Sequence, residues 1–190
     1  MPETRADNVL MQKVRDGDLA KMAVLFERHH RALFRYFVRL SGNREASEDL
    51  VQDVFFRMLK YRHSYQDGNP FTSWMYQVAR NAHLDSMAKR KGETALDMGR
   101  EEGQYEPASA DPDPAEVLRR RQDLSLLRRA LAALPLEKRE VLVLSRFQNL
   151  KYEQIADILA CDVGAVKLRV YRAVKALSQI FFELAGEKAS

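Results

Sequence analysis

The segment from Glu153 to Leu177 constrains the fold most, because two helical patterns of apolar residues follow each other there within a short stretch. The first pattern consists of Ile155, Ala156, Ile158 and Leu159, and the second of Val166, Val170, Ala173 and Leu177. Apolar residues at three- and four-residue steps stack on one face of a helix and must pack against something. The run from Cys161 to Gly164 breaks this spacing, so the segment predicts a helix, a tight turn and a second helix.

The opposite face of the second predicted helix is basic. It carries Lys167, Leu168, Arg169, Tyr171, Arg172 and Lys175. Arginine and lysine can reach phosphates or guanine edges in the major groove of DNA, where an aliphatic side chain can contact a thymine methyl group. A basic helix face can also be an ordinary solvated surface, but the preceding helix and turn favour DNA. We therefore interpret this face as a candidate DNA-reading surface.

Charge divides the chain into three parts. Residues 1–91 hold 16 Lys and Arg against 11 acids, residues 92–118 hold 1 against 8, and residues 119–190 hold 14 against 8. The middle part also contains several glycines and prolines and few large apolar residues, a composition that cannot bury enough surface to fold. We predict an all-α chain of two small helical domains, residues 1–91 and 122–190, joined by a flexible acidic linker over residues 92–121.

Composition argues against several classes of protein. No apolar run approaches the roughly 20 residues that span a bilayer, and the N-terminal residues lack the apolar segment of a signal peptide. The single cysteine, Cys161, allows no internal disulfide and is too few for a structural zinc site. We expect a cytoplasmic protein with no metal, no cofactor and no membrane insertion of its own, in which Cys161 is a packing residue.

The first domain should contain a long helix from Leu19 to Leu40, with Asp18 as its N-cap. The next predicted helix, Glu45 to Tyr61, places Phe56 in the middle of a polar face. That face is formed by Asp49, Gln52, Asp53, Arg57 and Lys60. An aromatic ring there indicates a protein contact with a polar rim, although single exposed apolar residues are also common.

A loop over residues 63–71 and a helix from about Thr72 to Lys91 complete this domain. Trp74 is assigned to the core, while an outer arc is predicted for Tyr76, Arg80, His83, Arg90 and Lys91. Aromatic and cationic groups on one surface suit single-stranded nucleic acid, because the rings stack on bases and the charges meet phosphates. The alternative is a core tryptophan with ordinary surface charges around it.

These motifs together resemble the extracytoplasmic-function sigma factors of bacterial RNA polymerase. Region 2 of that family is matched by ASEDLVQDVF at residues 46–55 and by WMYQVARN at residues 74–81, with Asp85. Region 4 is matched by Leu134-Pro135, by REVL at 139–142, by YEQIA at 152–156, and by GAVKLR at 164–169 with Arg172-Ala173. The resemblance covers roughly residues 18–91 and 122–182, and both motifs occur in the family's order across a short acidic linker.

The resemblance implies a role for each surface. Asp49, Gln52, Asp53, Phe56 and Arg57 would contact the clamp of the largest polymerase subunit, and the flap region is a further expected contact. The minus-ten element of the promoter would be bound by His63, Ser64, Asn69, Tyr76, Arg80, Asn81, His83, Arg90 and Lys91. Holding a flipped base offsets the cost of unstacking it, so melting needs no ATP from this protein. The basic helix face would read the minus-thirty-five element, and an anti-sigma factor is an expected partner.

Three positions depart from the family pattern: Lys151 stands in place of a capping Ser or Thr, Ala160 in place of a turn glycine, and Leu168 in place of a small polar residue. The expected function is promoter recognition and melting for core polymerase, without catalytic residues. A helix-turn-helix regulator that acts without polymerase is the alternative, but it leaves Phe56 and the Tyr76/Arg80 surface unused. No nucleophile, metal or phosphate-loop spacing supports an enzyme.

Overall fold

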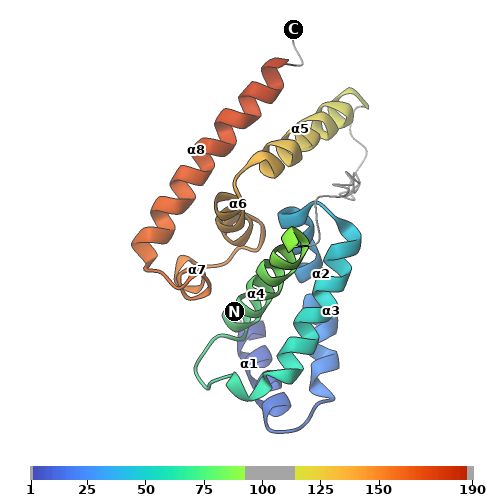
Figure 1. The fold of residues 1–190 in the computed structure, drawn as a ribbon, viewed down its shortest axis with the longest axis vertical. Helices are drawn as coiled ribbons and strands as arrows, with labels where there is room; N and C mark the ends of the chain where they lie inside the picture. Colours follow the sequence, from blue (N-terminus) through green and yellow to red (C-terminus); the bar gives the residue numbers. More distant parts are fainter. Residues whose placement is uncertain (1, 93–113, 188–190) are drawn as a thin grey trace.

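The computed structural model of the chain describes residues 2–92 and 114–187, and both ranges are helical (Figure 1). The elements are α1 (Pro2–Arg15), α2 (Lys21–Ser41), α3 (Arg44–Lys60), the short 3-10 helix η1 (Arg62–Ser64), α4 (Phe71–Gly92), α5 (Pro114–Ala133), α6 (Leu136–Leu142), the π-helical turn η2 (Val143–Phe147), α7 (Tyr152–Leu159) and α8 (Val163–Glu187). Within these ranges there is no strand, and the predicted all-α fold is confirmed.

Helices α1 to α4 form the first bundle. Its core contains the fully or nearly fully buried side chains of Leu33, Phe37, Val54, Met58, Met75 and Ala79, which come from α2, α3 and α4. Between α2 and α3, Gly42 has a φ of 73°, a left-handed conformation that glycine adopts readily at the end of a helix. The side chain of Asn43 then accepts a hydrogen bond from Ala46 N at 2.9 Å and caps the start of α3.

The predicted start of α2 was wrong. The helix begins at Lys21 instead of Leu19, and Ala20, not Asp18, holds the N-cap position without a side-chain hydrogen bond. The chain first makes a tight turn, in which Lys21 N donates to the backbone oxygen of Asp18, and this turn places the Asp18 carboxylate two residues before the N-cap position. It lies instead 3.6 Å from Lys21 Nζ.

The second bundle consists of α5 to α8, and the long helix α8 packs along α5, α6 and α7 (Figure 1). The predicted inner face of α8 is confirmed, since Val166, Val170 and Ala173 are buried. The helix-turn-helix pattern is confirmed as α7 and α8, with α8 starting two residues before Ala165 because Asp162 Oδ1 accepts a hydrogen bond from Ala165 N at 2.8 Å.

The turn between α7 and α8 contains an alanine in a backbone conformation that favours glycine. Ala160 adopts φ 49° and ψ 51°, a left-handed conformation in which its β-carbon is crowded. Cys161 is half-buried and packs against the core, as expected for a packing residue. At the other end of α7, Lys151 N donates to Gln154 Oε1 at 3.0 Å, so a glutamine replaces part of the missing Ser or Thr cap.

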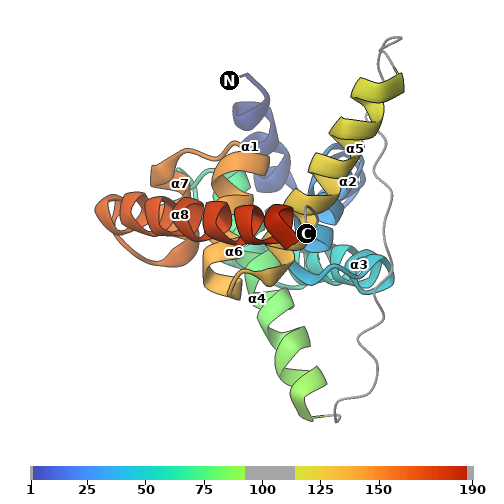
Figure 2. The same cartoon turned by 90° about the horizontal axis from the view of Figure 1, so that it is seen from above.

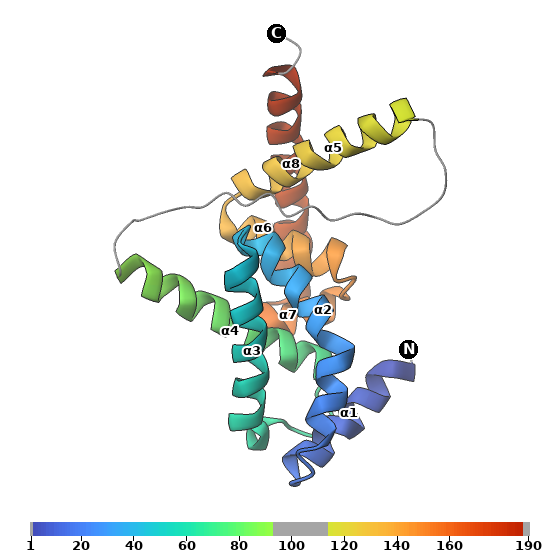
Figure 3. The same ribbon diagram turned by 90° about the vertical axis from the view of Figure 1, so that its right-hand side faces the viewer.

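The two bundles pack against each other, with α4 beside α7 and α2 beside α5, α6 and η2 (Figures 1 and 3). Buried residues of both bundles form one contiguous apolar core. Viewed from above, the end of α4 projects from one side of this body and the start of α5 from the other (Figure 2). Helix α5 begins at Pro114, inside the range predicted as linker, and residues 93–113 of that predicted linker lie outside the described residues.

Across the two described ranges, none of the helices is both long enough and apolar enough to cross a membrane.

Candidate functional site

The basic face of α8 is exposed along its whole length. All six residues predicted to read DNA are exposed: Lys167, Leu168, Arg169, Tyr171, Arg172 and Lys175. Leu168 is 47% exposed and Tyr171 67%, although both are large and apolar or aromatic. The structure places these side chains on the side of α8 opposite Val166 and Val170, so a groove of DNA could approach all of them together.

The polar face of α3 also has the predicted shape. Phe56 is 65% exposed, and Asp49 and Gln52 are exposed near it. Asp53 and Arg57 are half-buried. An aromatic side chain surrounded by polar groups in this way resembles the centre and rim of a protein contact.

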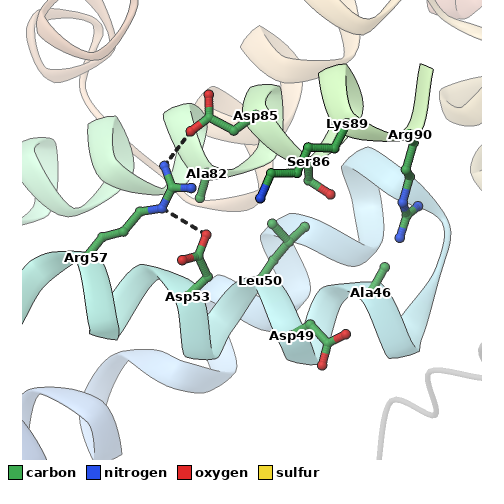
Figure 4. A pocket seen from close by; sticks show the side chains of 10 residues that line it. All are labelled: Ala46, Asp49, Leu50, Asp53, Arg57, Ala82, Asp85, Ser86, Lys89 and Arg90. Carbon is green, nitrogen blue, oxygen red and sulfur yellow. Dashed lines mark hydrogen bonds and ion pairs between the residues drawn. The ribbon is translucent and has the colours of Figure 1, made fainter. Parts of the chain in front are cut away.

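Arg57 does more than occupy this face, because it joins α3 to α4. Its Nε donates to Asp53 Oδ2 at 2.8 Å, and its Nη1 donates to Asp85 Oδ2 at 2.6 Å (Figure 4). These three side chains line a groove of about 190 Å³ between the two helices. The groove is lined by Ala46, Asp49, Leu50, Asp53, Arg57, Ala82, Asp85, Ser86, Lys89 and Arg90 (Figure 4).

The loop before α4 is anchored by a buried tyrosine, and its polar side chains are exposed. Tyr65 is buried against Trp74, with ring centroids 5.3 Å apart, and its hydroxyl donates to Asn69 O at 2.8 Å. Trp74 is buried, which confirms its assignment to the core. His63, Ser64 and the Asn69 side chain are exposed. This loop is therefore accessible in the way its predicted role requires.

The outer arc predicted for α4 is only partly exposed. Asn81 and Arg90 are exposed, and Lys91 lies in α4 but its side chain is outside the described residues. The expected exposure of Tyr76 and His83 was wrong, because these side chains are only 3% and 5% exposed. The physical reason is that the second bundle covers this face of α4. Whether these residues bind DNA in another arrangement stays a prediction.

Polar contacts connect the covered face of α4 to the second bundle. Tyr76 Oη donates to Gln148 Oε1 at 2.8 Å, and Gln77 Nε2 donates to Asp157 O at 2.9 Å. Arg80, which is half-buried, places its Nε 3.2 Å from Glu140 Oε1. Three residues within one and a half turns of α4 thus contact α6, α7 and the residue that follows η2.

Glu140 lies between two residues of the first bundle. The Tyr36 hydroxyl, on the fully buried Tyr36 side chain, donates to Glu140 Oε1 at 3.4 Å, and Arg80 Nε donates to Glu140 Oε2 at 3.3 Å. Burial raises the pKa of the Glu140 carboxyl, and the charge and hydrogen bond of Arg80 oppose this rise. Burial and the nearby Glu140 charge raise the pKa of Tyr36 well above its usual value.

His83 and Arg139 are incompletely satisfied where the bundles meet. Neither ring nitrogen of His83, nor Arg139 Nε, has a hydrogen-bond partner among the described residues. Burial lowers the pKa of His83, and the positive charges of Arg139 and Arg90 lower it further. Burial also lowers the pKa of Arg139, whose Nη1 donates to Leu40 O at 2.5 Å.

Sequence reasoning did not identify Gln77, Glu140 or Gln148 as residues of a shared surface. The REVL motif contains Glu140, but the motif shows only that this acid follows an arginine. Its partners are 60 and 104 residues away in the chain. Within the described ranges, no group of three or more His, Cys, Asp and Glu side chains could hold a metal ion.

Two family models match the chain, one over each bundle. The family described as Sigma-70 region 2 matches residues 25–93, and the family described as Sigma-70, region 4 matches residues 124–177. The first match contains the α3 face, the loop and α4. The second contains η2, the helix-turn-helix and the whole basic face of α8.

Similar curated proteins carry both regions. The ECF RNA polymerase sigma factor SigE of Mycolicibacterium smegmatis is 32% identical over 176 residues, which cover 91% of this chain and 67% of that protein. The RNA polymerase sigma factor CarQ of Myxococcus xanthus is 31% identical over 179 residues, which cover 94% of this chain and 99% of that protein.

Two solved structures share the fold across both bundles. CnrH in complex with the cytosolic domain of CnrY aligns with a TM-score of 0.70 at 22% identity, over 94% of this chain and 98% of CnrH. The sigma factor RpoE in complex with the anti-sigma factor NepR from Bartonella quintana aligns with a TM-score of 0.66 at 25% identity, over 83% of this chain and 94% of RpoE.

Proposed function

Because the chain belongs to the extracytoplasmic-function sigma factors of the sigma-70 family, we propose a role in transcription initiation for each of its exposed surfaces. The chain is an alternative sigma factor that binds core RNA polymerase and directs it to promoters. Sigma factors of this family are DNA-binding initiation factors, and we infer that this chain catalyses no reaction itself. Its place of action is then the cytoplasm, where polymerase and promoters are found.

The α3 face is the proposed contact for core polymerase. Phe56 provides an apolar anchor, and Asp49, Gln52, Asp53 and Arg57 form the rim. Buried aromatic anchors within polar rims carry much of the energy of protein interfaces. We assign this face to the clamp of the largest polymerase subunit, and the second bundle to the flap region.

Promoter DNA is bound at two places. The loop with His63, Ser64 and Asn69, together with Arg80 and Asn81, receives an unstacked base of the minus-ten element. The exposed face of α8 reads the minus-thirty-five element as a duplex, with Arg and Lys on phosphates or guanines and Leu168 near a thymine methyl. Arg90 and Lys91 extend the minus-ten surface along α4, and Tyr76 and His83 add to it once the second bundle has moved away from them.

We propose an anti-sigma factor as a further partner. The similar sigma factor RpoE was solved in complex with the anti-sigma factor NepR, which supports this assignment by analogy. The exposed α3 face and the exposed α8 face are the surfaces that such a protein would need to cover to block polymerase or promoter.

The observation that carries this proposal is that an exposed aromatic face in region 2 and an exposed basic face in region 4 occur in one chain. The test is transcription in vitro by core polymerase on genomic fragments, with and without the purified chain. We expect transcripts from discrete start sites only when the chain is present, and co-purification of the chain with core polymerase. DNA binding without any association with core polymerase would contradict the proposal and favour a regulator that acts alone.

A further inference from the structure

We propose that α1 positions the loop over residues 63–71 and thereby sets how strictly this loop selects a base of the minus-ten element. The positioning side chains are Asn8, Gln12 and Arg15, and Asp7 holds them against α2. The match to Sigma-70 region 2 begins at residue 25, so it does not include α1. The inference rests on the proposed function, because the loop must be the part that receives the unstacked base.

Helix α1 packs beside α2 and η1, and a buried carboxylate fixes it to α2 (Figure 3). Asp7 is only 3% exposed, and its two oxygens contact different side chains of α2. Oδ1 accepts from Arg28 Nη1 at 2.6 Å, and Oδ2 lies 2.9 Å from His29 Nε2. A buried carboxylate is costly without such partners, so these contacts favour one rotation of α1 about its axis. His29 also packs against the Phe71 ring, with centroids 5.2 Å apart, which links this anchor to the end of the loop.

Asn8, the next residue of α1, holds the end of the loop. Its Oδ1 accepts a hydrogen bond from Phe71 N at 2.8 Å. Phe71 is the first residue of α4, and the first amides of a helix have no acceptor within that helix. Pro70, which precedes α4, has no side-chain oxygen that could act as a cap. The cap is therefore supplied by another helix, and the junction between the loop and α4 depends on the position of α1.

Gln12 and Arg15 hold the middle of the loop. Asp67 Oδ1 accepts from Gln12 Nε2 at 2.9 Å and from Arg15 Nη1 at 2.8 Å. Arg15 Nη1 also donates to Tyr65 O at 3.4 Å. The hydrogen bond from Arg15 lowers the pKa of the Asp67 carboxyl, which favours the charged form that this contact uses. Asn8, Gln12 and Arg15 follow each other at steps of four and three residues, so one face of α1 carries all three.

The contacts with α1 leave another side of the loop free to bind. Helix α1 engages the loop through Tyr65 O, the Asp67 carboxylate and Phe71 N. The side chains proposed to receive a base are exposed instead: His63, Ser64 and Asn69. The loop is therefore held through its backbone and its single acidic side chain, while its candidate binding residues remain accessible.

Fixing the loop in advance affects base selection more than stability. A site discriminates well only when its groups are held within about 0.5 Å of the bound geometry, whereas a loop that can rearrange accepts more than one partner. The ion pair of Arg15 and Asp67 contributes little to stability, because the Asp67 side chain is 65% exposed and surface ion pairs are weak. Loss of this pair should therefore leave the fold intact and relax the selection of the base.

The first test measures base selection by Arg15→Ala and Asp67→Ala, each bound to core polymerase, on promoters randomised in the minus-ten element. We expect both variants to reduce the preference at one base of this element by about fivefold or more, with the upstream preference and core binding unchanged. The two losses should not add in the double variant, because both remove the same contact. Lys13→Ala removes an exposed cation from the same helix and is the matched control, which should select as the wild type does.

The second test measures the positioning itself, by hydrogen exchange in the free chain. Asn8→Ala removes the acceptor of Phe71 N, whereas Asn8→Asp keeps an oxygen at the same place. We expect the amides of residues 65–71 to exchange about tenfold faster in Asn8→Ala and in Arg15→Ala, and at the wild-type rate in Asn8→Asp and Lys13→Ala. Unchanged exchange in α2 and α3 would show that the bundle itself remains folded.

The outcomes separate this inference from the proposed function. If the wild type selects a minus-ten element and both Arg15→Ala and Asp67→Ala select it equally strictly, the role of α1 is overturned alone. Unchanged exchange of the loop amides would overturn it as well. A uniform loss of binding in Arg15→Ala, with the base preference kept, would show that Arg15 contacts phosphates and does not position the loop. A wild-type chain that selects no minus-ten base with core polymerase would overturn the proposed function of the loop, and the role of α1 with it.

Discussion

Arg80 Nε lies 3.2 Å from Glu140 Oε1, and this ion pair joins α4 of the first bundle to α6 of the second. Glu140 is buried, and the Tyr36 hydroxyl approaches its Oε1 as well. Attraction between buried charges is largely offset by the cost of removing them from water. The apolar core shared by the bundles must therefore supply most of the stability of the contact, while the pair fixes its geometry.

The first prediction concerns pH. Burial between the packed bundles raises the pKa of Glu140 above its ordinary value of 4.5, so a chain with packed bundles binds this proton more tightly than one with its bundles apart. The packing of the bundles should gain stability as pH falls from the raised pKa toward 4.5, and lose it as pH rises through the raised pKa. Energy transfer between dyes on Cys161 and on an Ala23→Cys substitution in α2, followed through this window, measures the effect.

Glu140→Gln is the control for this prediction, because an amide cannot titrate. His83 has a lowered pKa and gives a pH dependence of opposite sign, but it does so in both proteins. Arg80, Tyr36 and Glu137, the charged and titratable groups that act on Glu140, are also unchanged. Only the difference between the two proteins is assigned to Glu140. Identical pH profiles would show that the Glu140 carboxyl does not couple its protonation to the packing of the bundles.

The second prediction tests the α3 face. Phe56→Ala should leave folding near that of the wild type, because the ring is 65% exposed, but should weaken binding of core polymerase by roughly 2 kcal/mol. Leu19→Ala, at a side chain between α1 and α2 that is 50% exposed and outside the proposed binding surfaces, is the matched control and should have no such effect. Pull-down of core polymerase at several concentrations measures both. Equal affinity of the two variants would remove Phe56 from the contact.

The third prediction concerns the melted strand. Asn81 is exposed on α4 next to Arg80, and it has no role in the contacts between the bundles that the structure describes. Asn81→Ala should therefore permit closed promoter complexes while reducing the number of permanganate-reactive thymines near the start site. Arg80→Ala should reduce them too, although it also releases Glu140. Equal loss of closed and open complexes would mean that Asn81 supports the fold and not the strand.

The reading face of α8 could be predicted from sequence because only one side of this helix is buried. The buried residues Val166, Val170 and Ala173 recur at regular three- and four-residue steps. This spacing assigns Lys167, Arg169 and their neighbours to the opposite side. The exposure of Phe56 followed in the same way from α3. In both cases the periodicity of apolar residues within one helix is sufficient to predict which side chains are exposed.

Helix α4 could not be predicted in this way because it is buried on two sides. Met75 and Ala79 are buried in its own bundle, whereas the Tyr76 hydroxyl reaches Gln148 and His83 lies near Arg139, both in the second bundle. Tyrosine and histidine are amphipathic, so their spacing is equally consistent with an exposed binding face and with a polar contact inside the protein. The deciding partners, Glu140 and Gln148, are more than 50 residues away in sequence.

The fourth prediction concerns the turn of the helix-turn-helix. Ala160 has a φ of 49°, and a left-handed conformation costs a residue with a β-carbon about 1–2 kcal/mol. Ala160→Gly should therefore stabilise the chain by about 0.5–1 kcal/mol, after the greater flexibility of unfolded glycine is subtracted. Ala88→Gly, at an exposed position in α4, should instead destabilise it by about 1 kcal/mol. Urea unfolding of the three proteins measures this contrast, and a destabilised Ala160→Gly chain would contradict it.

The last prediction separates two kinds of contact on α8. Lys175 is exposed toward the middle of the helix, beyond the other residues of the reading face, and should contact phosphates. Lys175→Ala should then weaken binding to all sequences alike and lower the slope of log affinity against log salt by about one. Titration of duplex DNA at several salt concentrations measures this change.

Leu168 should instead contact a base, because it is a 47% exposed apolar side chain between the exposed cations Lys167 and Arg169. An apolar group gains from a thymine methyl, whereas a hydroxyl can hydrogen-bond to a base edge. Leu168→Ser should therefore change the preferred upstream element at one base pair by roughly 1 kcal/mol or more, without abolishing binding. Selection from a promoter library with each protein compares the preferred elements. If both proteins select the same element, Leu168 does not touch the bases, and sequence must be read by Tyr171 and Arg172, the next exposed side chains along the helix.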